Sequence, residues 1–218
     1  MTTSLRTKVH EAIEALRQDL LDEDGPRIST MRNYRFAILV YDPKEEFTLR
    51  QQIQWLTALL KSQGWNVGQI FLNQILLKRL RQEEQRVIDS IISREHRLYE
   101  RNPDRALNHV KEKIAAYVEG PDGIAKDIIE EIDRFVNENP VEADRTVIFL
   151  RRAGALYPFL RSSALLKHLD GKTRNLPVVL LYPGERVYPN ESRDARTQSL
   201  KFMGELSGDR DYRPRIYC

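Results

Sequence analysis

The sequence has little cysteine and no long hydrophobic run. Its one cysteine, Cys218, excludes an intrachain disulfide framework and a metal site built from clustered cysteines, and it favours a reducing compartment. No run approaches the roughly 18 apolar residues of a membrane span. The N-terminal segment alternates apolar and charged side chains and lacks the apolar centre of a secretory signal. We therefore expect a soluble cytoplasmic protein.

Glycine-rich phosphate loops and catalytic signatures are also missing. The segments after the apolar runs 35–41 and 146–150 read YDPKEE and RRAGALYP, and neither contains GxxxxGK[ST] or GxGxxG. GxSxG and HExxH are absent, and the four histidines are scattered over charged helical segments, which is typical of solvated surface. We therefore expect no catalytic residue, no metal and no cofactor. One alternative stays open, a phosphate site lined by Arg151, Arg152 and Arg161.

Negative charge is scarce in the C-terminal third. Residues 151–218 contain 13 Lys and Arg against 7 Asp and Glu, whereas residues 1–150 contain 22 against 25. Such an excess of positive charge can attract an acidic partner or nucleic acid, and it is also typical of a solvated face. Tyr212, Arg213 and Arg215 come nearest to a nucleic-acid surface, although they equally suit an edge strand.

Periodic apolar residues predict alternating helices and strands in the first 72 residues. A helix over 5–20 precedes a buried strand at 35–41, and a second strand follows at 65–72. Between the strands a helix over 44–63 is expected to be capped by Asp42. The acidic residues at its start suit the helix dipole better than a catalytic cluster. The residues expected to be buried by this helix are Phe47, Ile53, Leu56 and Leu60.

The pattern of apolar residues after position 72 predicts a long helical region and then more strands. Residues 73–100 have a helical pattern, and two amphipathic helices follow before residue 140. Strands are expected at 146–150, 176–184 and 212–217, with a helix starting at Tyr157 and Pro158 and another over 197–206. The expected fold is a single α/β domain over 1–218, a three-layer, mostly parallel sheet of about five strands with flanking helices and a helical insertion or cap at 73–140.

Three blocks of the sequence resemble one family. They are ILVYDPKEEFTLRQQIQWL (38–56), VIFLRRAGALYPFLRSSALLKHL (147–169) and PVVLLYPG…TQSLKFMGEL…DYRPRI (177–216). With LYPFLRS, PVVLLYPG and QSLKFMG among them, nearly the whole chain resembles the BrxB family of BREX (bacteriophage exclusion) systems. The chain departs from the family pattern at residues 151–154, RRAG, where members read TGVG, and at 185–197, which is expected to be an extended loop.

The resemblance implies a role in phage resistance, in systems where an adenine methyltransferase marks host DNA. It assigns no catalytic residue and implies a non-enzymatic adaptor. The implied partner is PglZ, the alkaline-phosphatase-like protein of these systems, which the adaptor would help couple to the methyltransferase. A degenerate nucleotide-binding sensor domain and direct DNA contact within the complex are the alternatives. The candidate ligand- or partner-binding residues are Arg151, Arg152, Tyr157, Arg161, Arg213 and Arg215.

Overall fold

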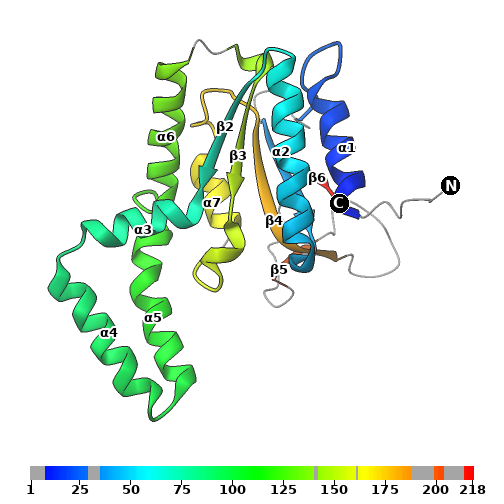
Figure 1. The fold of residues 1–218 in the computed structure, drawn as a ribbon. Coiled ribbons are helices and arrows are strands. Elements are labelled where there is room, and N and C mark those ends of the chain that lie inside the picture. Colours follow the sequence, from blue (N-terminus) through cyan, green and yellow to red (C-terminus); the bar gives the residue numbers. More distant parts are fainter. Residues whose placement is uncertain (1–7, 29–34, 140–141, 161, 188–198, 204–213) are drawn as a thin grey trace.

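Parallel strands buried on both faces form the centre of the molecule. The computed structural model describes residues 8–28, 35–139, 142–160, 162–187, 199–203 and 214–218. Within these residues a six-stranded sheet contains five parallel strands in the order β2-β3-β4-β1-β6, and β5 pairs antiparallel with β4 (Figure 1). The strands are β1 (Phe36–Tyr41), β2 (Asn66–Phe71), β3 (Thr146–Arg151), β4 (Val178–Val187), β5 (Ser199–Phe202) and β6 (Arg215–Tyr217).

Helices cover both faces of the sheet. Short 3-10 helices, η1 (Pro43–Glu45), η2 (Ala143–Arg145) and η3 (Ala153–Leu156), lie in the connections. The α-helices are α1 (Lys8–Leu20), α2 (Glu46–Ser62), α3 (Leu72–Gln82), α4 (Gln85–Tyr99), α5 (Pro103–Val118), α6 (Ile124–Glu138) and α7 (Ser162–Leu169). The predicted three-layer α/β class with a mostly parallel sheet is confirmed.

Alternating side chains of the strands enter two separate cores. In β1, Ile38 packs with residues of α3, α5, α6 and α7, whereas its neighbour Leu39 packs with residues of α1 and α2. Both side chains are fully buried. Because successive strand residues point to opposite faces, a strand covered by helices on both sides must be apolar throughout. This requirement explains the continuous apolar runs of β1, β3 and β4.

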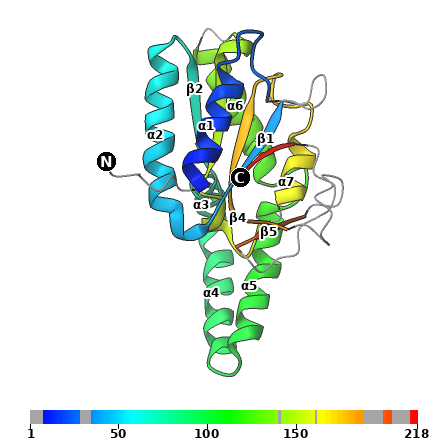
Figure 2. The same ribbon diagram turned by 90° about the vertical axis from the view of Figure 1, so that its right-hand side faces the viewer.

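Helices α4 and α5 project away from the sheet as a hairpin. They follow α3 in the connection between β2 and β3, and both views place them beyond the edge of the sheet (Figures 1 and 2). The helical pattern expected over 73–100 forms two helices, because the chain breaks after Gln82 and resumes as α4 at Gln85. We call α4 and α5 the helical arm.

The helix expected over 197–206 is wrong. Residues Ser199–Phe202 form β5, and the flanking positions lie outside the described residues. Leu200 and Phe202 are buried against one core, so the apolar residues follow the period of a strand. Strand β4 supplies the pairing partner because it continues past residue 184 to Val187. Residues 185–187 of the expected loop therefore belong to a strand, and the rest of that loop lies outside the described residues.

Two smaller expectations were wrong as well. Phe47 is 72% exposed, because the stripe of α2 that faces the sheet begins two residues later, at Leu49. The helix expected from Tyr157 and Pro158 starts only at Ser162, after η3. Asp42 does act as a cap, since its Oδ1 accepts a hydrogen bond from the Lys44 backbone N–H at 2.9 Å, but it caps the short helix η1 and not α2, which begins at Glu46.

Candidate functional site

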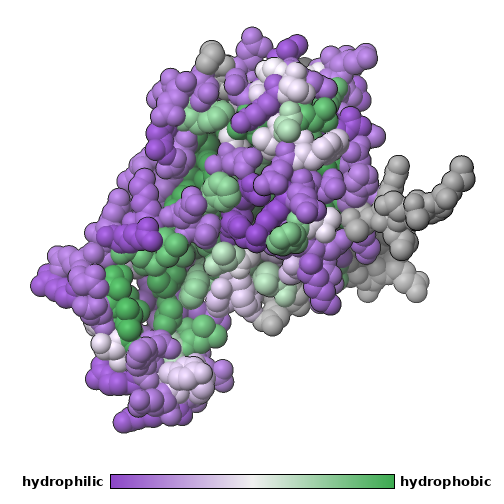
Figure 3. Space-filling model, in the orientation of Figure 1, coloured by the Kyte–Doolittle hydropathy of each residue, from purple (hydrophilic) through white to green (hydrophobic). Residues whose placement is uncertain are grey.

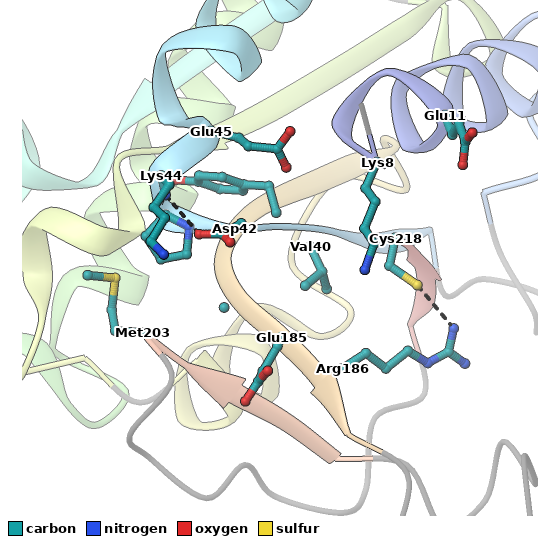
Figure 4. Close-up of a pocket in the computed structure, with 13 residues that line it drawn as sticks. Lys8, Glu11, Val40, Asp42, Lys44, Glu45, Glu185, Arg186, Met203 and Cys218 are labelled. Carbon is teal, nitrogen blue, oxygen red and sulfur yellow. Dashed lines mark hydrogen bonds between the residues drawn. The ribbon is translucent and has the colours of Figure 1, made fainter. Parts of the chain in front are cut away.

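The carboxyl ends of β1 and β4 border an open cavity. Ligands of parallel α/β proteins bind at this edge of the sheet. The two strands pair in register up to Tyr41 and Pro183, and the cavity beyond them has a volume of about 830 Å³. Figure 4 shows side chains from α1, η1 and the end of β4 around it, with Cys218 at one side.

The charges around this cavity are mixed. The charged lining residues are Lys8, Lys44 and Arg186 against Glu11, Asp42, Glu45 and Glu185. A helix N-terminus normally attracts a phosphate through free backbone N–H groups and the helix dipole. Here the carboxylate of Asp42 already accepts the N–H of Lys44. The cavity therefore lacks the features of a phosphate cradle.

A cluster of arginines lies at the carboxyl ends of β2 and β3, and Glu46 is its central acceptor. Arg50 Nε lies 3.0 Å from Glu46 Oε1, and Arg152 donates to the same oxygen at 3.3 Å. Tyr41 donates its hydroxyl to Glu46 Oε2 at 2.5 Å. One carboxylate at the start of α2 thus joins the ends of β1 and β3.

Arg151 is the buried member of this arginine cluster. Its side chain is only 9% exposed, and its Nη1 donates to Gln69 Oε1 at 2.6 Å. The guanidinium also lies 5.2 Å from the ring centroid of Phe71. Gln69 offers a neutral amide and Phe71 an aromatic ring, so neither of these contacts neutralises the charge of Arg151.

Burial perturbs two ionisable groups of the cluster. Burial lowers the pKa of Arg151, and the neighbouring charge of Arg152 lowers it further. Burial raises the pKa of Tyr41 well above its usual value, and the hydrogen bond and negative charge of Glu46 add to the effect. Tyr41 therefore stays neutral and acts as a donor to Glu46.

The structure separates the other predicted site residues from this cluster. Tyr157 packs into one core, with its ring centroid 6.1 Å from that of Phe202. Arg215 pairs with Asp19 at 2.6 Å and sits beside Ala37, near the amino end of β1 and therefore at the opposite edge of the sheet. The remaining candidates, Arg161 and Arg213, lie outside the described residues.

Sequence reasoning assigned Glu46 only to the helix dipole and did not single out Arg50 or Gln69. The spacing of Glu46 and Arg50, four residues apart on a helix, is a readable signal for an ion pair. The contacts of Glu46 with Tyr41 and Arg152 link the ends of two different strands. No short stretch of sequence could therefore have predicted them.

Exposed apolar side chains gather on α3 and the helical arm. Among the described residues, six large hydrophobic side chains are exposed, and four of them belong to these three helices. The four are Leu77, Ile92, Tyr99 and Leu107. Figure 3 shows a hydrophobic surface over this part of the molecule, with a hollow in it. The hollow is an apolar groove of about 430 Å³ between α3, α4 and α5.

The described residues offer no metal centre and no membrane span. No group of three or more His, Cys, Asp or Glu side chains there could hold a metal ion. No helix in the same ranges is long and apolar enough to cross a bilayer.

Fold and surface together define a three-layer α/β protein with a projecting helical arm and an internally paired arginine cluster. Residues 69–216, more than half of the chain, match the model of a family described as BREX protein BrxB. The chain belongs to the BrxB family, and this membership supports a role in the BREX phage-defence system.

A curated relative agrees with this assignment. The chain is 25% identical over 179 residues to a BREX protein BrxB of Bacillus cereus (strain H3081.97), which covers 82% of this chain and 80% of the relative. No solved structure matches the chain. The family range begins within β2 and contains α3 and the helical arm, so these helices belong to the part that the family shares.

Proposed function

We propose that this protein is a non-enzymatic adaptor of a BREX phage-resistance complex, which binds PglZ and helps couple it to the DNA adenine methyltransferase. The observation that carries the proposal is the contrast between two surfaces. The arginine cluster at the sheet edge is held by internal contacts, whereas the arm exposes apolar side chains. Exposed apolar patches of this kind are typical of protein–protein interaction sites.

Co-expression with PglZ tests this function. The protein and PglZ are expected to co-purify at moderate salt and to elute together in a complex of fixed stoichiometry, with the methyltransferase joining when it is present. The adaptor function is contradicted if the protein elutes alone while PglZ and the methyltransferase still associate with each other.

A degenerate nucleotide-binding sensor domain is the second candidate. One observation favours it, since Arg151 is a buried guanidinium that donates a hydrogen bond to a neutral side chain, Gln69. Together, Arg50, Arg151 and Arg152 place three positive charges beside the single carboxylate of Glu46. A phosphate-bearing ligand would supply the missing negative charge.

A thermal-shift screen of nucleotides and cyclic dinucleotides distinguishes this candidate from the adaptor. A true ligand should raise the melting temperature in the wild-type protein and fail to do so in Arg152→Gln, which removes the more exposed guanidinium. A flat response at millimolar ligand would exclude the sensor and leave the adaptor unaffected.

A further inference from the structure

Helix α4 is amphipathic but contributes no buried residue to the protein. None of its 15 residues is buried, although Val87, Ile88, Ile91 and Ile92 form an apolar stripe. A stripe of this width normally faces a core. Three of these residues, Ile88, Ile91 and Ile92, line the groove, and the protein leaves all four partly or largely exposed.

The groove is lined mainly by aliphatic side chains. Seven of its eleven lining residues are aliphatic, and they come from all three surrounding helices. They are Leu77 and Leu80 of α3, Ile88, Ile91 and Ile92 of α4, and Val110 and Ile114 of α5. From Gln85 to Glu95 the α4 side extends for about 15 Å at 1.5 Å per residue, or about three helical turns.

We propose that this groove is the docking site for one amphipathic helix of the partner protein, with apolar residues at i, i+3 or i+4, and i+7. The inference rests on the proposed function, in which that partner is PglZ. A helix of about three turns matches the length of the groove, and its apolar side chains would complete the burial of Ile88, Ile91 and Ile92.

Charge complementarity indicates which way the docked helix runs along the groove. Arg81 lines the groove where α3 meets α4, and Glu95 lines it toward the tip of the arm, next to Glu100. At the Arg81 end, Glu83 accepts a hydrogen bond from Tyr117, whose pKa burial and Glu83 raise. The docked helix should therefore place an acidic residue at Arg81 and a basic residue near Glu95.

Net charge favours a foreign helix over a second copy of this chain. Residues 72–118 contain 10 Lys and Arg against 7 Asp and Glu, so α3 and the arm are net positive. Two copies of this surface would carry net charge of the same sign and repel each other, which disfavours a second copy as the occupant of the groove.

The test compares two equally exposed apolar residues in binding to purified PglZ. Ile92 in the groove is 48% exposed, and Trp55 on α2 is 45% exposed. In the full-length protein, Ile92→Asp should weaken PglZ binding by about 30-fold or more, because it places a carboxylate in an apolar contact. Trp55→Asp should change the affinity by less than about twofold. Circular dichroism and melting temperature confirm that both variants fold.

Charge reversal at the rim gives a second measurement. Arg81→Glu should slow association with PglZ by about fivefold at low salt, and the difference should shrink at high salt because rim charges act mainly on the association rate. Lys61→Glu on α2 is the matched control, since Lys61 is also exposed and lies outside the groove. An equal effect of the two reversals would overturn the predicted polarity of the helix.

Other results would show whether the groove inference fails alone or together with the adaptor function. If Ile92→Asp binds PglZ as tightly as wild type, the groove inference is wrong and the adaptor function stands. If wild-type protein does not bind PglZ at all, the adaptor function fails and the groove inference fails with it. If light scattering finds a dimer that Ile92→Asp dissociates, the occupant is a second copy, which also overturns the inference.

Discussion

The central strands and the helical arm contain similar aliphatic residues but bury them differently. Every residue of β1 and β3 is buried, whereas no residue of α4 is buried. The strands are covered by helices on both faces, and α4 is packed on one side only. The fold therefore accounts for the apolar residues of the strands, whereas it leaves the apolar stripe of α4 only partly covered.

The largest effect should come from truncating a core side chain. Phe149 is fully buried in the core under α1 and α2. Phe149→Ala should lower the free energy of unfolding by about 3–5 kcal/mol, through lost burial and the cavity that remains. Denaturant unfolding followed by circular dichroism measures it. A loss below about 1 kcal/mol would break the contrast between sheet and arm.

A smaller loss of stability is expected from adding a side chain at Gly68 of β2, where the backbone lies close to neighbouring side chains. A Cβ on Gly68 would collide with Cδ1 of Ile148 and lie 3.5 Å from the ring of Phe135. Gly68→Ala should therefore cost about 1–3 kcal/mol through overpacking. Ile148→Val removes the colliding methyl group, so a double-mutant cycle should show a smaller cost of Gly68→Ala in that background. Simple additivity would mean that the collision is not the cause.

Alkaline pH should weaken the sheet through two buried tyrosines. Burial raises the pKa values of Tyr41 and Tyr217 above 10.0, and their bonds to Glu46 and Asp19 add to the shift. Their stabilisation is complete below pH 10.0 and is lost as the pH rises further, because only the unfolded chain then releases these protons. Above pH 10.0, each tyrosine should lower the free energy of unfolding by up to about 1.4 kcal/mol for every pH unit. Unfolding titrations of Tyr41→Phe above pH 10.0 should show a shallower slope than wild type.

The smallest effect should come from the arm. Ile92→Ala should change the free energy of unfolding by no more than about 0.5 kcal/mol, because nearly half of this side chain is already exposed to solvent. Urea unfolding measures it beside Phe149→Ala. A cost of several kcal/mol would show that Ile92 supports the fold, and the contrast drawn here would then be lost.

The sequence predicts the central strands that are buried on both faces better than the short strand β5. Continuous apolar runs locate β1, β3 and the start of β4, because burial on both faces leaves no room for polar residues. Strand β5 was expected to be helical, since four residues carry too little periodicity to separate strand from helix. Its conformation depends on pairing with the extension of β4, which lies at a distance along the chain.

In the candidate site, too, the sequence predicts the positions of residues along a strand but not their contacts with distant parts of the chain. Arg151 and Arg152 lie at a strand end, as their position after an apolar run predicts. Their partners Gln69 and Glu46 are 82 and 106 residues away, so no local pattern could reveal the contacts. The groove needs three helices in a particular arrangement, and amphipathic spacing alone does not give the angle between them.

The pairing of β6 with β1 sets an order for folding during synthesis. Strand β1 and helix α1 leave the ribosome early, yet β6 pairs with β1 and Tyr217 donates a hydrogen bond to Asp19 across 198 positions of the chain. One edge of β1 must therefore stay open while the rest of the protein is translated. Unpaired strand edges are sites of unwanted association. Newly made chains truncated before Arg215 should for this reason aggregate more readily than chains that contain β6.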